Sequence, residues 1–152
     1  MRLEKVISGR QTGMDRAGLD AAMSAGIPVG GYCPKGRKAE DGTVPERYPL
    51  TELPSENYLD RTERNVIESD ATLILNMGAL TGGTALTLQF AEKHGKPYLV
   101  EALDNDPDPI LVARWLHEHH IRVLNVAGPR ESKHPGLVHE RATEFLRLVF
   151  GV

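Results

Sequence analysis

Two hydrophobic patterns alternate along this chain: short apolar runs, and longer stretches in which apolar residues recur every three to four positions. The short runs predict five strands, at residues 4–8, 27–32, 71–77, 97–101 and 122–126. The longer stretches predict five helices, at residues 15–25, 56–69, 84–94, 108–120 and 137–150. This alternation is typical of the α/β class, in which helices cover both faces of a parallel sheet. We therefore expect one domain over residues 1–152, a three-layer α/β/α sandwich with a mostly parallel sheet of at least five strands.

The sequence also predicts where three of the strands lie in the sheet. Residues 71–77 are apolar at almost every position, which predicts a central strand buried on both faces. We expect residues 4–8 to lie beside it, because the loops that follow these two strands must meet to form one site. Pro28 favours a place near the edge for the strand at 27–32, since proline cannot donate a ladder hydrogen bond.

Residues 33–56 form the longest stretch without a sustained hydrophobic period. A loop of this length in a compact domain is usually functional, and the alternative is a tolerated surface insertion. Its charged residues Lys35, Arg37 and Glu40 favour the functional interpretation. Ser55 is the expected N-cap of the helix that follows.

Composition narrows the class of protein. The 152 residues are 40% hydrophobic and 26% charged, as in a soluble globular domain. The single cysteine, Cys33, cannot form an internal disulfide and fits a reducing cytosol. There is no apolar run long enough for a membrane span and no signal-like N-terminus, so we expect a cytoplasmic protein without a membrane partner. The net charge of −3 argues against nucleic-acid binding.

Three loops that follow strands carry residues suited to anions. Such loops lie at the carboxyl edge of an open parallel sheet, where ligands bind. The candidate binding residues are Gly9, Arg10, Gln11, Thr12, Gly13, Asp15 and Arg16 in the first loop, Gly78, Thr81, Gly82, Gly83 and Thr84 in the second, and Arg130, Ser132 and Lys133 in the third. Glycines let a phosphate approach the backbone, helix starts offer free N–H groups, and arginine binds oxyanions bidentately. Each loop alone also fits an ordinary connection, but together they predict one focused anion site in an acidic protein.

Two further groups favour structural roles. His117, His119 and His120 lie at the end of a predicted helix, where histidine suits the negative end of the helix dipole, and their spacing is not that of a His-Glu-x-x-His site. Cys33 is interpreted as a small buried hydrophobic residue. The sequence therefore assigns no metal ligand and no catalytic residue.

Several motifs together resemble the putative molybdenum carrier family. They are ISGRQTGMDRA at residues 7–17, GGYCPKGR at 30–37, AEDG at 39–42, YPL at 48–50, SDAT at 69–72, TGGT at 81–84 and NVAGPRES at 125–132. Lys35 and Gly36 fall within the second motif and complete the candidate binding residues. The resemblance implies a Rossmann-like fold, a homo-oligomer, and storage or delivery of molybdenum cofactor. Arg10 departs from it, since the family usually carries a second glycine there, and this arginine narrows the first loop or adds an anion contact.

Three functions remain open at this stage. The first is a carrier that binds molybdenum cofactor, or another phosphorylated small molecule, without turnover. The second is a sensor or binding module for another nucleotide, and the third is a nucleotide-processing hydrolase. The family is also related to lysine-decarboxylase-like phosphoribohydrolases, whose glycine loop carries a catalytic glutamate three residues after its threonine. Thr87 stands at that place here, so we expect no hydrolysis by that route.

The same resemblance indicates three further groups of residues to examine: carboxylates for hydrolysis, aromatic rings for a pterin, and helices for an oligomer interface. Hydrolysis would need a carboxylate from elsewhere, such as Glu40, Asp41 or Glu131. Tyr32 and Tyr48 are the aromatic residues near the proposed loops that could stack on a pterin. For the homo-oligomer, the helices at 56–69 and 137–150 are the candidate interface elements.

Overall fold

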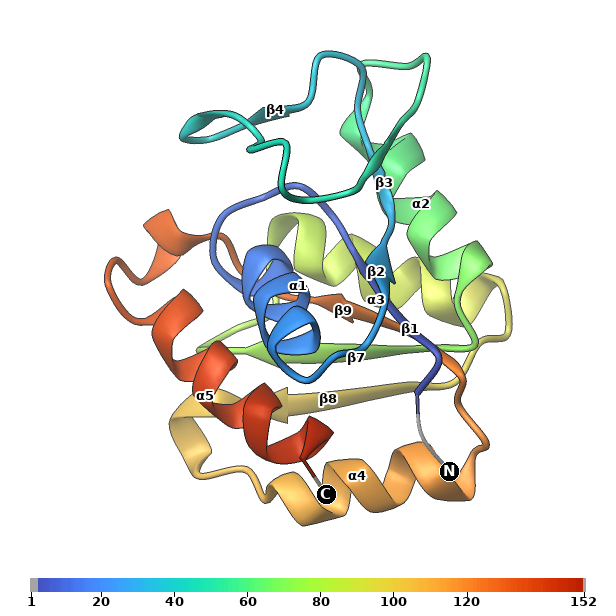
Figure 1. Ribbon diagram of the computed structural model, residues 1–152, viewed down its shortest axis with the longest axis vertical. Coiled ribbons are helices and arrows are strands. Elements are labelled where there is room, and N and C mark those ends of the chain that lie inside the picture. The colour runs from blue at the N-terminus through green and yellow to red at the C-terminus, as the bar shows by residue number, and fades with distance from the viewer. Residues whose placement is uncertain (1–2, 152) are drawn as a thin grey trace.

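The computed structural model describes residues 3–151, which form a five-stranded parallel sheet with helices on both faces (Figure 1). The strands of this sheet are β1 (Lys5–Ser8), β2 (Val29–Gly30), β7 (Ala71–Asn76), β8 (Tyr98–Ala102) and β9 (Val123–Ala127). The helices are α1 (Met14–Ser24), α2 (Tyr58–Glu68), α3 (Gly82–Lys93), α4 (Pro109–Glu118) and α5 (Val138–Phe150), with short 3-10 turns at Leu103–Asn105 and Glu131–Lys133. The expected α/β sandwich is confirmed.

Two helical layers enclose the sheet. α1 packs closely against α5, and α4 packs against α5 on the same side, whereas α2 and α3 pack against each other on the opposite side. The main core lies between the sheet and the first layer, where Leu73, Leu75 and Leu124 of the strands meet Val112 and Leu146 of the helices. All five of these side chains are fully buried, as the apolar runs predicted.

The order of the strands is β2–β1–β9–β7–β8, which corrects one expectation. β1 and β7 are not neighbours, because β9 lies between them and pairs with both in parallel register. Polar bonds fix this place: the Ser8 hydroxyl donates to the Val126 carbonyl at 2.6 Å, and the Asn125 amide donates to the Thr72 hydroxyl at 3.2 Å. The order matches the 3-2-1-4-5 arrangement of a Rossmann sheet, with the last strand of the chain in the position of strand 1.

The segment 33–56 is more ordered than its sequence predicts. It contains β4 (Lys38–Ala39) and β5 (Gly42–Thr43), which form a hairpin, and β3 (Tyr32–Cys33) and β6 (Thr51–Glu52), which pair in parallel. A separate small core supports it, made of Leu19, Cys33, Val44, Tyr48 and Leu50. We call residues 32–52 the excursion; it projects from the sheet at the top of Figure 1.

One arginine and one glycine build the excursion. The Arg37 guanidinium donates to the carbonyls of Leu50, Pro45 and Tyr48 at 3.1–3.2 Å, which ties the segment into a closed loop. Gly31 has a φ of 128° and packs against the Ser8 backbone, where a side chain would clash. The predicted strand at 27–32 is therefore broken there, and its two halves belong to different sheets.

Three helix starts differ from expectation. α2 is capped by Asn57, whose side chain accepts from the Leu59 N–H at 2.9 Å, instead of by Ser55. α3 begins at Gly82, so the second glycine loop is part of the helix. α1 begins at Met14, one residue before the predicted start, with Gly13 as its N-cap residue.

Candidate functional site

A pocket of about 500 Å³ lies where the loops after β1, β7 and β9 meet. Its lining comprises Arg10, Gln11, Asp15, Tyr58, Arg61, Asn76, Met77, Gly78, Ala79, Thr81, Gly82, Gly83, Thr84, Thr87, Ala127, Gly128, Pro129, Arg130, Lys133 and His134. The strand order reverses direction between β9 and β7, so the pocket sits at the switch point where open α/β sheets bind ligands. Its volume is that of a site for a small organic molecule.

The structure brings most of the predicted binding residues together. Those in the pocket lining are Arg10, Gln11, Asp15, Gly78, Thr81, Gly82, Gly83, Thr84, Arg130 and Lys133. Those outside the lining are Gly9, Thr12, Gly13, Arg16, Lys35, Gly36 and Ser132. Lys35 and Gly36 belong to the excursion and are exposed. Arg16 lies on α1, and the other four lie in the segments around the pocket that follow β1 and β9.

The start of α3 forms one wall of the pocket. A Cβ atom added at Gly78, Gly82 or Gly83 would meet no atom within 4 Å, so these residues face open space. The first N–H groups of a helix have no partner within the helix and attract anions. Thr87 does not offer its hydroxyl to a ligand, because that hydroxyl donates to the Gly83 carbonyl at 2.9 Å. This wall can hold a phosphate through backbone donors.

A buried ion pair forms a second part of the lining. The Arg61 Nη1 atom of α2 lies 3.8 Å from the Asp15 Oδ2 atom of α1, and both side chains are largely buried. Burial raises the pKa of Asp15, although the charges of Arg61 and Arg10 oppose this shift. Burial likewise lowers the pKa of Arg61, while Asp15 raises it and Arg10 lowers it further. The site therefore concentrates charge in a poorly hydrated place.

The first-loop glycines shape this site by close packing. A Cβ atom at Gly9 would overlap the Arg61 guanidinium, and one at Gly13 would lie 2.6 Å from the Pro129 carbonyl oxygen. Gly13 also has a φ of 75°, which side chains rarely adopt. Both glycines thus allow the first loop to pack against α2 and the third loop.

Two carboxylates of the excursion hold the loops beside the pocket. Glu40 accepts hydrogen bonds from the Thr12 hydroxyl and from the Ser132 hydroxyl and N–H, and its Oε2 atom lies 3.5 Å from Arg130 Nε. Although burial acts to raise it, these hydrogen bonds leave the pKa of Glu40 below its usual value. Asp41 pairs bidentately with Arg16 at 2.5 and 2.8 Å. Thr12, Ser132 and Arg16 thus bind the excursion.

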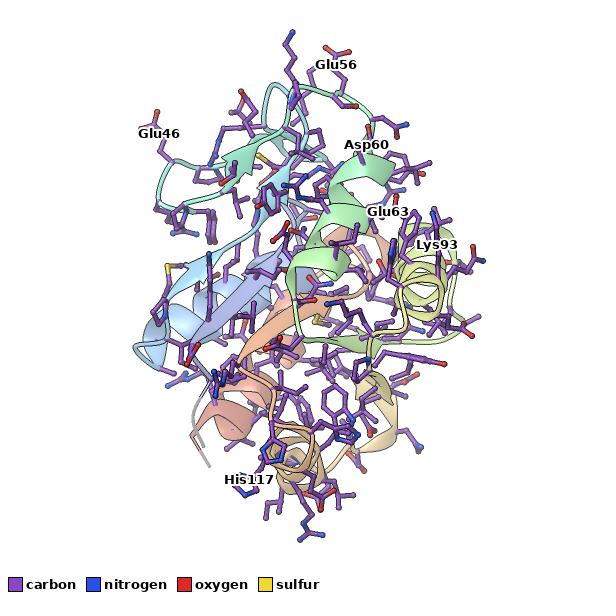
Figure 2. All side chains as sticks on the ribbon, turned by 90° about the vertical axis from the view of Figure 1, so that its right-hand side faces the viewer. Glu46, Glu56, Asp60, Glu63, Lys93 and His117 are labelled. Carbon is purple, nitrogen blue, oxygen red and sulfur yellow. The ribbon has the colours of Figure 1, made fainter. Side chains whose placement is uncertain are left out.

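The remaining candidates lie away from the pocket. The residues described contain no group of three or more metal-ligating side chains. His117 lies on α4 at the opposite end of the molecule from the excursion, whose Glu46 points outward in Figure 2. Cys33 is buried, and burial raises the pKa of its thiol. None of the described helices is long and apolar enough to cross a membrane.

Comparisons with known proteins were made for the whole chain. A family model described as the circularly permutated YpsA SLOG family matches residues 6–150. The chain belongs to this family. A solved structure named as a putative molybdenum carrier protein, from Syntrophus aciditrophicus SB, is 48% identical, with 99% of this chain and 96% of that chain covered and a TM-score of 0.91. No curated protein matches the chain.

The circular permutation accounts for the strand order of this SLOG-family chain. If β9 were the first strand, followed along the chain by β1, β2, β7 and β8, the sheet would have the 3-2-1-4-5 order of a Rossmann fold. Moving that strand to the C-terminus leaves its neighbours unchanged, because the contacts do not depend on where the chain begins. The loop after β9 consequently lies between the two glycine loops and joins them into one site.

Ten of the twenty described lining residues were not predicted from the sequence, and two of them, Tyr58 and Arg61, come from α2 instead of the three loops. Tyr58 and Arg61 are three positions apart on α2 and therefore lie on one face of the helix. Tyr58 is 45% exposed, whereas Tyr48 is buried in the excursion core and Tyr32 stacks against Arg64. The available signal was the arginine one turn after an aromatic residue, but a solvated helix face gives the same pattern.

Proposed function

We propose that this protein is a carrier that binds molybdenum cofactor, or a related phosphorylated small molecule, in the pocket between β9 and β7 without turnover. The observation that carries the proposal is the α3 wall, where the positions of Gly78, Gly82 and Gly83 open onto the pocket. A helix start with exposed glycines is suited to a phosphate. The solved relative named as a molybdenum carrier supports the choice of cargo.

The charge of the lining supports an anionic ligand. The described lining contains four cationic side chains, Arg10, Arg61, Arg130 and Lys133, and one carboxylate, Asp15. From outside the lining, Glu40 also faces Arg130 at 3.5 Å. The whole protein has a net charge of −3, so positive charge is concentrated at this pocket. Cationic clefts of this kind raise the local concentration of anions.

The lining also fits the planar part of such a cargo. Tyr58 offers an exposed ring at the pocket, and Met77, Ala79 and Pro129 add apolar surface. Aromatic rings stack on flat heterocycles, so Tyr58 takes the role that the sequence analysis gave to Tyr32 and Tyr48. A pterin and a nucleobase both satisfy this surface.

The test is to identify what the native protein carries. Protein purified gently from its natural source is analysed by mass spectrometry for organic ligand and for molybdenum. We expect an organic phosphate that copurifies with molybdenum, and we expect Gly83→Val protein prepared in parallel to have lost it. A nucleotide without molybdenum would favour the nucleotide-binding alternative, and an empty wild-type pocket would count against both.

A further inference from the structure

Besides the start of α3, where the proposed phosphate site lies, the pocket is lined by cationic side chains from other elements. Arg10 follows β1 and Arg61 lies on α2, and both line the pocket. Arg130 and Lys133 line it from the loop after β9. Asp15 in the lining and Glu40 just outside it offset two of these four positive charges, so the pocket keeps an excess of two.

Arg61 has donor capacity that the protein does not use. Its Nε atom is buried and has no hydrogen-bond partner within residues 3–151. The Arg61 Nη1 atom lies 3.8 Å from Asp15 Oδ2, which is too long for a hydrogen bond. That oxygen already accepts from the Gln11 N–H at 3.2 Å. The protein thus leaves donors of Arg61 unused, and a ligand oxygen would reach this guanidinium from the pocket that Arg61 lines.

Arg10 is fixed beside Arg61 by the excursion. Its Nε atom donates to the Lys38 carbonyl of β4 at 3.0 Å, which leaves the two Nη groups for other partners. Its charge acts on both members of the buried pair, since it contributes to the pKa of Asp15 and of Arg61 after the larger effect of burial. The guanidinium is therefore held in place by one hydrogen bond while its fork remains available.

We propose that Arg10 and Arg61 form a second anion subsite, so that the pocket prefers a ligand with two linked anionic groups, as in a diphosphate, over a single phosphate. This proposal rests on the proposed function. One anionic group binds at the start of α3, and the second binds between the two guanidinium groups. Arg10 is then the residue that determines this specificity, because it supplies the free fork of the second subsite.

The experiment compares inorganic phosphate with pyrophosphate, and AMP with ADP, by isothermal titration calorimetry. We expect wild-type protein to bind the diphosphate member of each pair at least about tenfold more tightly. Arg10→Ala should reduce this ratio to about threefold or less while leaving the affinity for phosphate nearly unchanged, and Arg10→Lys should give an intermediate ratio. Arg114→Ala is the matched control, since it removes one exposed arginine of α4, outside the described pocket lining, and should keep the wild-type ratio.

The ratio distinguishes specificity from a structural effect. Loss of the bond to Lys38 that merely loosened the excursion would change both affinities together and leave their ratio intact. A wild-type ratio near one, or a ratio preserved in Arg10→Ala, overturns the second subsite while the proposed function stands. Wild-type protein that binds none of the four probes at millimolar concentration overturns the proposed function, and the second subsite falls with it.

Discussion

Gly83→Ala is expected to separate folding stability from ligand binding. Gly83 lies in the first turn of α3 with an ordinary helical backbone, and an added Cβ atom would meet no atom within 4 Å. Alanine loses less backbone entropy than glycine in a helix, so the free energy of unfolding should rise by roughly 0.5–1 kcal/mol. For a chain of this size the melting temperature should rise by about 1–4 °C.

The same methyl group should weaken ligand binding. It would project into the pocket where the glycine now leaves room for a phosphate next to the backbone N–H groups. Loss of one good hydrogen bond to a charged group costs about 1.5–3 kcal/mol, which corresponds to at least about tenfold in affinity. Gly83→Val should weaken binding further and leave the melting temperature nearly unchanged, because valine has a lower helix propensity than alanine.

Calorimetry measures both effects on one preparation. Scanning calorimetry of the ligand-free protein gives the melting temperature, and titration with ADP and with phosphate gives the affinity. Gly13→Ala is the opposing control and should lower the melting temperature, because Gly13 has a φ of 75° and its Cβ atom would lie 2.6 Å from the Pro129 carbonyl oxygen. Gly83→Ala protein that binds both probes as tightly as wild type would remove the start of α3 from the site.

Four further outcomes are expected. Arg130→Ala should lower the affinity for phosphate by about tenfold in titration calorimetry, by loss of one charge-assisted contact. Glu40→Gln should make the melting temperature fall less steeply as the pH is lowered. The folded pKa of Glu40 lies below its ordinary value of 4.5, so the carboxylate stabilises the fold above that pH, and this contribution is lost as the pH falls through the folded pKa. Nucleoside monophosphates should yield no free base by chromatography; turnover abolished by Asp15→Asn would identify an enzyme, since Asp15 is the carboxylate that the described pocket lining contains. Light scattering at micromolar concentration should give the mass of a dimer or larger assembly, and a monomeric mass would refute the homo-oligomer.

The structure also limits the hydrolase alternative. Glu40, Asp41 and Glu131 were the carboxylates proposed to replace a missing glutamate. Glu40 binds Ser132 in the segment after β9, and Asp41 pairs with Arg16 of α1. Glu131 accepts from the His139 N–H at 2.9 Å, at the start of α5. None of the three lines the pocket. A test of catalysis therefore has to begin with Asp15, which the sequence analysis assigned to ligand binding.

The sequence by itself determined the elements and the edge of the sheet at which the pocket lies. Apolar runs and helical spacing are local signals, and β7 and α5 lie within one residue of their predicted bounds because both patterns are complete within the element. The glycines of the second loop were likewise recognisable, since a Gly-Gly-Thr after a buried strand and before a helix is also a local pattern. These signals were sufficient for the α/β class and for half of the pocket lining.

Only the tertiary structure decided the strand order, the fold of the excursion and the position of Arg61 in the pocket lining. The bond from Ser8 to Val126 joins residues 118 positions apart, and no local pattern says that the last strand inserts between β1 and β7. The excursion has no period because a few long-range contacts hold it, through Arg37 and a separate small core. The helical pattern alone is that of a surface residue for Arg61, and only the packing of α2 places this side chain beside Asp15. Long-range pairing is decided by how the faces of all elements are buried together, which the residues of one element do not encode.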